Sequence, residues 1–194
     1  MEGIFSAFGL SASAGLNAYI PMLIVALLAK FTNLINLNQP WDTLTSWWVI
    51  GLLVVLSAVE FFADKIPAVN HINDVIQTIV RPTAGAILFA ASADTLTDIH
   101  PVLSLAAGLL VAGGVHAAKA GALRPAVTAT TAGTGNIFVS ILEDIISTIM
   151  SILAVLLPVV LGVLIVMFGA WVIWFFWRRQ NRKLAKQAAN KNLR

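Results

Sequence analysis

The stretch VEFFADKIPAVNHINDVIQTIVRPTAG, residues 59–85, decides the fold and the place where function is expected. It follows an apolar run, begins with a short charged segment and continues with polar residues at helical spacing. The other long segments of the chain are almost uncharged. Because charge in or beside hydrocarbon is costly, its ionisable side chains need a reason to be there. They are Glu60, Asp64, Lys65, Asp74 and Arg81.

The composition indicates a polytopic membrane protein. Hydrophobic residues make up 59% of the 194 residues, charged residues make up 11%, and the mean hydropathy is +0.89. About a quarter of the residues of an average soluble domain are charged. The length allows about five or six crossings of ~20 residues each. We therefore expect an all-α, polytopic transmembrane helix bundle with interrupted helices. The chain has no cysteine, which excludes disulfides, thiolate metal sites and a cysteine nucleophile.

The basic residues are concentrated at the C-terminus. Seven of the 12 Lys and Arg residues follow Trp177, with no acid among them. We expect one transmembrane helical domain over residues 1–177 and a basic tail over residues 178–194. An aromatic belt precedes the tail, and the positive-inside rule then predicts a cytoplasmic C-terminus. Binding of anionic lipid or nucleic acid by the tail is the alternative; we expect no nucleic-acid partner.

The N-terminal apolar segment, residues 5–31, has the length of one crossing but is interrupted by small and polar residues. Small side chains at Gly9 and Ser13, and at Ser11 and Gly15, predict the close approach of a neighbouring helix. Asn17 has two interpretations: a hydrogen bond to a neighbouring helix, or a ligand contact at a broken helix.

The next segments alternate between apolar and amphipathic. An exposed loop is expected over residues 32–46 and a second crossing over residues 47–63. Residues 70–80 form an amphipathic helix by their spacing. Proline disfavours helical geometry at the preceding residue, so Arg81-Pro82 should break or kink it.

The second half contains a small-residue helix and a long apolar run. A fourth crossing is expected over residues 102–120, with His116 as a packed, hydrogen-bonded residue. Its close contact with a neighbour is expected along Gly113, Ala117 and Gly121. Residues 128–136 have the composition of a loop. Residues 137–177 are too long for one crossing, because 41 helical residues span about 60 Å. A break at Pro158 or Gly162 gives six membrane segments in total, with five full crossings as the alternative.

An internal repeat is suggested by two nine-residue segments. INDVIQTIV, residues 72–80, matches LEDIISTIM, residues 142–150, and aligns Asp74 with Asp144. The repeat halves would be about residues 5–95 and 102–177. Duplicated transporters place their sites where such halves meet.

Four polar motifs resemble a bacterial family of small integral-membrane proteins, the domain-of-unknown-function family 4126. They are SAGLNAY at residues 13–19, VEFFADKIP at residues 59–67, the D…T…RP..G pattern of residues 74–85, and Asn136 with Ser140, Glu143 and Asp144. The shared positions are polar residues at fixed spacing. The resemblance implies a multi-pass protein of the bacterial inner membrane and no established activity.

The polar residues predict a small integral-membrane transporter or channel for a cation or small polar solute. The alternative is a structural, accessory or lipid-handling membrane protein, in which Asp64 with Lys65 and Asp74 with Arg81 are ion pairs at the membrane rim. An enzyme is not expected, since the motifs of metalloproteases, hydrolases and phosphate-binding loops are missing from the sequence.

The carboxylates among the candidate residues are hard oxygen ligands, which would suit Mg²⁺, Mn²⁺ or Na⁺, but the sequence assigns no metal site and no cofactor. The expected partners are the lipid bilayer, the small cation or polar solute, and further copies of the chain in a homo-oligomer.

The candidate residues fall into two groups. The ligand or ion pathway is assigned to Asn17, Glu60, Asp64, Asp74, Asn136, Glu143 and Asp144, and charge pairing to Lys65, Arg81, Lys119 and Arg124.

Overall fold

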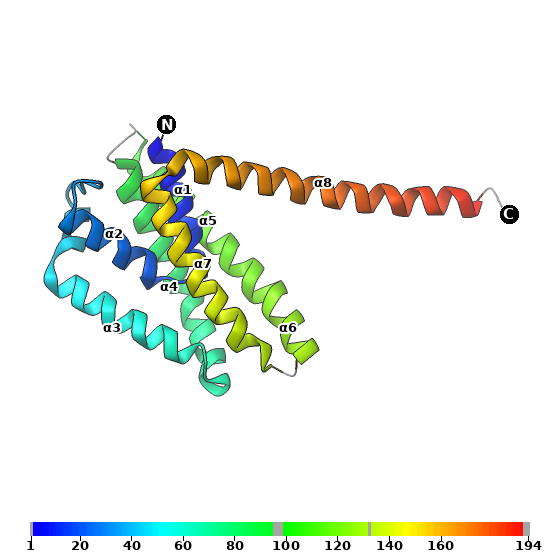
Figure 1. Cartoon of the computed structure of the whole chain (residues 1–194), viewed down its shortest axis with the longest axis horizontal. Coiled ribbons are helices and arrows are strands. Elements are labelled where there is room, and N and C mark those ends of the chain that lie inside the picture. Colours follow the sequence, from blue (N-terminus) through cyan, green and yellow to red (C-terminus); the bar gives the residue numbers. More distant parts are fainter. Residues whose placement is uncertain (1, 95–98, 132, 192–194) are drawn as a thin grey trace.

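The computed structural model describes residues 2–94, 99–131 and 133–191, and these residues form helices and connections without a β-strand. Figure 1 shows a compact bundle from which one long helix, α8, extends. The expected all-α fold is confirmed. The elements are α1 (Glu2–Leu16), α2 (Tyr19–Phe31), the short 3₁₀-helix η1 (Trp41–Thr45), α3 (Trp47–Ala63), α4 (Pro67–Asp94), α5 (Pro101–Ala118), the π-helical turn η2 (Lys119–Leu123), α6 (Arg124–Thr131), α7 (Gly135–Leu156) and α8 (Pro158–Lys191).

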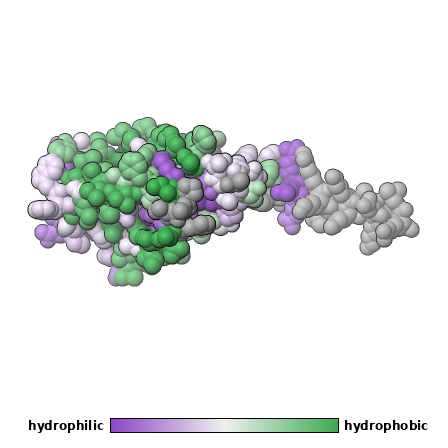
Figure 2. All heavy atoms as spheres, turned by 90° about the horizontal axis from the view of Figure 1, so that it is seen from below, coloured by the Kyte–Doolittle hydropathy of each residue, from purple (hydrophilic) through white to green (hydrophobic). Residues whose placement is uncertain are grey.

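The chain is a membrane protein by the length and apolarity of its helices. Within the described residues, four helical segments are long and apolar enough to cross a bilayer, and three shorter apolar helices accompany them. Hydrophobic residues cover much of the bundle's surface in Figure 2. Such a surface suits lipid, because a soluble protein seldom exposes a contiguous apolar area of this kind. The long segments are Ile72–Ala93, Pro101–Thr131, Gly135–Leu156 and Pro158–Asn181.

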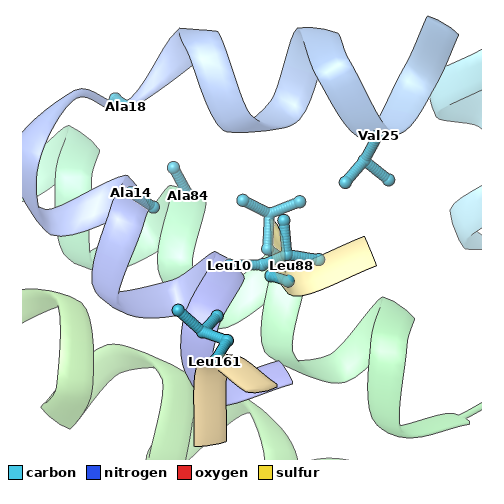
Figure 3. Close-up of a cluster of buried hydrophobic side chains, with 8 residues drawn as sticks. Leu10, Ala14, Ala18, Val25, Ala84, Leu88 and Leu161 are labelled. Atoms are coloured by element: carbon cyan, nitrogen blue, oxygen red, sulfur yellow. The ribbon is translucent and has the colours of Figure 1, made fainter. Parts of the chain in front are cut away.

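The N-terminal segment is a broken helix. α1 ends at Leu16 and α2 begins at Tyr19, with Asn17 at the break. Leu10 of α1 and Val25 of α2 belong to the same buried apolar cluster, so the two helices fold back on each other as a V rather than continuing in line (Figure 3). The break predicted near Asn17 is therefore a reversal of the chain inside the bundle.

α1 lies at the centre of the bundle, against α4, α5, α7 and the start of α8. Its small residues permit this, as expected: Ser11 donates a hydrogen bond to the Gly108 carbonyl at 2.8 Å, and a side chain at Gly15 would collide with Ala112 and Val115. Helix backbones that approach this closely gain dispersion contacts and interhelical hydrogen bonds.

The small-residue contact of α5 lies on a different face from the one predicted. The buried positions of α5 are Ser104, Gly108, Ala112 and His116. A Cβ added at Gly121 would meet nothing within 4 Å. Spacing by four residues recurs on every side of this alanine- and glycine-rich helix, so only the positions of α1 and α4 select the face that packs.

α4 is continuous through Pro82, so the break expected at Arg81-Pro82 is not present. Proline lacks the N–H that would bond the carbonyl of Thr78, yet the rest of α4 is held by packing against α1 and α5.

The loop expected over residues 128–136 is also shorter than predicted. α6 extends to Thr131 and α7 begins at Gly135, while residue 132 lies outside the described residues.

The long apolar run is divided at Leu157, directly before Pro158, where a hairpin or break was expected. α8 contacts the bundle at its beginning: Leu161 is buried with Leu10, and a side chain at Gly162 would collide with Phe5. From there α8 leaves the bundle (Figure 1) with its apolar side chains exposed. The predicted 178–194 tail begins within α8, and its division from the 1–177 domain stays a prediction.

Candidate functional site

Ionisable side chains from four parts of the chain meet inside the bundle. Seven are linked to one another by ion pairs, and Lys65 and Asp144 form a separate pair; we call all nine the ion network. Five are carboxylates and four are cations, and each makes at least one ion pair of 3.5 Å or less. Several are almost inaccessible: Arg81 is 0% exposed and Glu60 is 1% exposed. Removing charges from water costs several kcal/mol per ion unless they are paired and hydrogen-bonded. The members are Glu60, Asp64, Lys65, Asp74, Arg81, Lys119, Arg124, Glu143 and Asp144.

Arg81 of α4 joins α3 and α5 to the network. Its guanidinium donates to Glu60 Oε1 from Nη2 at 2.8 Å and from Nε at 3.3 Å, and Nη2 lies 3.5 Å from Asp64 Oδ2. On its other side, Nη1 lies 3.2 Å from His116 Nδ1. A guanidinium only donates, so His116 Nδ1 accepts and Nε2 carries the proton toward Thr78 Oγ1, 3.2 Å away. The expectation that His116 is a packed, hydrogen-bonded residue is confirmed.

Arg124 is the second centre of the network. Its Nη1 contacts both carboxylate oxygens of Asp74 at 2.8 and 2.9 Å, while its Nη2 lies 3.2 Å from Asp64 and 3.2 Å from Glu143. Lys119 Nζ lies 2.7 Å from the same Glu143 oxygen. Charge-assisted bonds of this length are among the strong ones in proteins. Arg124 therefore connects α4, the α3–α4 turn and α7.

The π-helical turn η2 lets Lys119 and Arg124 reach one carboxylate. Residues five apart in an α-helix point about 140° from each other, so a regular helix would place these cations on different faces. In η2 the Arg124 N–H bonds the Lys119 carbonyl, a spacing of five that widens the turn. Both side chains consequently contact Glu143. Single π-helical turns of this kind occur frequently at functional sites.

Asn17 and Lys65 hold Asp144 at the break between α1 and α2. Asn17 Nδ2 donates to Asp144 Oδ1 at 2.9 Å, and its Oδ1 accepts from the N–H groups of Tyr19 and Ile20, which begin α2. Lys65 Nζ lies 3.3 Å from Asp144 Oδ2. Of the two interpretations of Asn17, a hydrogen bond to a neighbouring helix is confirmed. The C-terminal end of α1 also joins the network, since Lys119 donates to the Leu16 carbonyl at 3.1 Å.

Asp64 occupies the turn after α3 and is surrounded by cations. Burial by itself raises the pKa of this carboxyl, but Lys119, Arg124 and Arg81 act in the opposite direction, and the pKa of Asp64 lies below its usual value. Asn73 supports the ionised form by donating to Asp64 Oδ1 at 2.7 Å. Asp64 is therefore an anion at neutral pH and can hold two guanidinium groups at once.

An open cavity of about 670 Å³ adjoins the network. Four network residues line it, together with a hydroxyl group of α4 and the hydroxyl and amide groups of the two helices that follow the π-helical turn. Its size is within the range of pockets that bind small molecules. The charged and polar lining residues are Asp64, Lys65, Asp74, Arg124, Thr78, Thr128 and Asn136.

The sequence-predicted site residues are brought together in this region. Asn136 lines the cavity and donates to Thr128 rather than to a network carboxylate. The expected local pairs, Asp64 with Lys65 and Asp74 with Arg81, are replaced by pairs between distant segments: Lys65 binds Asp144, and Arg124 binds Asp74. Asp74 and Arg81 are seven residues, or about 10 Å, apart along α4, and the turn after α3 brings Asp64 to Arg81 and Arg124 rather than to Lys65. The partners therefore come from other segments.

Sequence reasoning overlooked Asn73 and the π-helical turn. Asn73 lies four and eight residues before Gln77 and Arg81 and so shares their helix face, which was a usable signal. The π-helical turn had no such signal, because KAGAL at residues 119–123 reads as ordinary helix. Within the described residues, no group of three or more His, Asp and Glu side chains has the arrangement of a metal site.

The comparisons with known proteins identify a family. No curated protein and no solved structure matches the chain. The family described as "Domain of unknown function (DUF4126)" matches residues 4–178, which include α2 to α7 and all nine members of the ion network. The resemblance expected from the polar motifs is confirmed, and the chain belongs to this family of domains of unknown function.

Proposed function

We propose that this protein is a small membrane transporter or channel for a cation or small polar solute, with its binding site at the cavity beside the ion network. It would act in the bacterial inner membrane with its basic C-terminus in the cytoplasm. The observation that carries the proposal is the convergence of nine ionisable side chains, most of them buried, next to an open cavity of about 670 Å³. Ionisable groups inside membrane proteins mark substrate and ion pathways.

The balance of charge supports a cation over an anion. The network contains five carboxylates and four cations, and the hydrogen bonds of His116 fit its neutral form. With all nine groups ionised, the network carries one net negative charge inside an apolar bundle. Entry of one monovalent cation would neutralise it, whereas an anion would add to an existing imbalance.

The broken helix gives independent support. Transporters frequently place unwound helix segments at their binding sites, where backbone groups and helix ends can bind an ion. Here the ends of α1 and α2 are already bonded to the network through Leu16, Asn17, Lys119 and Asp144. Rearrangement at the cavity could thus be transmitted to the break.

A flux assay on reconstituted protein tests the proposal. Liposomes containing the full-length protein would be assayed for uptake of Na⁺, K⁺ and Mg²⁺, with Asp74→Asn as the site variant. Asp74 lines the cavity, and its side chain is 22% exposed, so the variant should fold. Asp42→Asn is the matched control, since Asp42 lies on the exposed η1 helix, away from the network.

The expected result is uptake of at least one cation that Asp74→Asn reduces and Asp42→Asn does not. Absence of flux for all three ions, with a monodisperse and folded protein, would favour the alternative of a structural or accessory membrane protein. That alternative is supported by one observation: each member of the network is paired with an opposite charge, as a structural lock between helices requires.

A further inference from the structure

One face of α7 carries a row of polar side chains, of which four are buried and Asn136, at the cavity end, is half-buried. The spacings of four, three, four and four residues keep them on the same side of the helix. They extend over 16 residues, or about 22 Å of helix, which is most of the thickness of a bilayer core. This row, which we call the α7 polar row, consists of Asn136, Ser140, Glu143, Ser147 and Ser151.

The half of the row nearer the cavity has oxygen atoms without a hydrogen-bond partner among the described residues. They are Asn136 Oδ1, Ser140 Oγ and Glu143 Oε1. Ser140 is 0% exposed and Glu143 is 5% exposed. A buried polar group left unsatisfied costs about 1–3 kcal/mol. Apolar side chains at these positions would pack the helices without this cost, so helix packing alone does not explain the polar residues.

The other half of the row is a chain of hydroxyl groups. Ser13 Oγ of α1 lies 2.9 Å from Ser147 Oγ and 2.7 Å from Ser151 Oγ, and either partner in each pair can donate. All three side chains are fully buried. The same hydroxyls also lie 2.7–3.1 Å from the backbone carbonyls of Ser13 and Ser147. A hydroxyl both donates and accepts, so each group that turns from a carbonyl to a neighbouring hydroxyl can receive a proton on one side and release one on the other.

We propose that the α7 polar row is a proton path, from the cavity at Asn136 through Glu143 to the serine hydroxyls of α1 and α7. The carboxylate of Glu143 takes up one proton at Oε1, becomes neutral, and is restored when that proton passes on. A water molecule carries the proton from Glu143 Oε1 to Ser147, because no direct hydrogen bond joins them. At each hydroxyl the arriving proton forms a new O–H bond while the original one breaks toward the next oxygen. The last proton leaves Ser151 to water at the far end of the row, and rotation of the hydroxyls restores the starting state. Unpartnered oxygens on the cavity side provide places for water molecules to connect Glu143 to the cavity.

The geometry favours a proton over a metal cation in this row. Metal cations need several oxygen ligands at about 2.0–2.6 Å, and the serine hydroxyls are already bonded to one another at 2.7–2.9 Å. A proton moves along such bonds without separating them. The proposal deepens the proposed function, on which it rests, by naming the proton as an ion that enters through the same cavity.

The test measures proton entry into liposomes that contain the full-length protein and the pH dye pyranine. A potassium gradient with valinomycin drives protons inward. Ser140→Ala is the decisive variant, because the Ser140 hydroxyl has no partner to lose and the variant should remain folded. Ser57→Ala is the matched control: Ser57 on α3 also has a buried, unpartnered hydroxyl, but it lies outside the α7 polar row.

We expect the wild type to acidify faster than empty liposomes. Ser140→Ala should slow this rate about tenfold, which corresponds to ~1.4 kcal/mol on the barrier. Ser140→Thr, which retains the hydroxyl, and Ser57→Ala should keep the wild-type rate. The inference is overturned if Ser140→Ala acidifies as fast as the wild type, or if the wild type is no faster than empty liposomes with and without Na⁺, K⁺ and Mg²⁺ present.

The assay also separates this inference from the proposed function. Uptake of a metal cation without proton movement overturns the proton path and leaves the proposed transporter standing. Proton movement that depends on Ser140, without flux of any other cation and without an effect of Asp74→Asn, supports the path and overturns the cavity as a site for other cations.

Discussion

Lys65 Nζ lies 3.3 Å from Asp144 Oδ2, although 79 residues separate them in the sequence. A second pair resembles it: Arg124, the first residue of α6, binds Asp74 of α4, while Lys65, two residues before α4, binds Asp144 of α7. The two pairs therefore tie α6 to α4, and the turn between α3 and α4 to α7.

The Lys65–Asp144 pair should couple measurably. The two side chains are 18% and 12% exposed, so solvent screens them only in part. In a double-mutant cycle with Lys65→Met and Asp144→Asn, we expect a coupling free energy of about 1 kcal/mol. Unfolding in mixed detergent micelles provides the measurement. Additive effects of the two substitutions would show that the pair contributes nothing to stability.

Removal of Arg81 should be the most damaging single change in the network. Arg81→Met leaves the Glu60 carboxyl, at 1% exposure, without its ion-pair partner, and breaking a buried pair in this way costs roughly 3–5 kcal/mol. The double variant Glu60→Gln/Arg81→Met should recover part of this loss, because no unpaired buried carboxyl remains. Thermal unfolding in detergent compares them, with the exposed Arg178→Gln as control. A double variant less stable than Arg81→Met would contradict the expectation.

Two glycines should respond oppositely to alanine. A Cβ at Gly108 would collide with the Gly85 backbone and with Phe89, so Gly108→Ala should force α4 and α5 apart and cost about 1–3 kcal/mol. Gly51 on α3 has nothing within 4 Å of an added Cβ. Gly51→Ala should therefore stabilise its helix by about 0.5–1 kcal/mol. Equal melting temperatures for the two variants would refute the close contact.

Asn17→Ala should destabilise the break between α1 and α2. It removes the cap on the first N–H groups of α2, worth about 1 kcal/mol, and a hydrogen bond to the Asp144 carboxylate. Hydrogen bonds to charged groups contribute about 1.5–3 kcal/mol, so the total should be roughly 2–4 kcal/mol. Asn33→Ala, at an exposed loop position, is the control. Urea or SDS titration would show whether the two variants differ.

The sequence alone determined the class of this protein and the identity of its polar residues. High hydropathy with few charges specifies a helical membrane protein, because a bilayer leaves no other way to satisfy the backbone of a short chain. The motifs around Asn17, Glu60, Asp74 and Asp144 were recognisable for the same reason: charged residues among apolar ones stand out, whatever they contact.

Only the tertiary structure decided how these residues pair. Local spacing suggested Asp64 with Lys65 and Asp74 with Arg81, but the actual partners come from other helices. A charge in an apolar interior pairs with whichever opposite charge the packing brings nearest, and packing depends on small residues such as Gly85 and Gly108 that repeat on several helix faces. The π-helical turn that aims Lys119 and Arg124 at Glu143 has the same origin, since its sequence is compatible with an α-helix and only the contacts around it favour the wider turn.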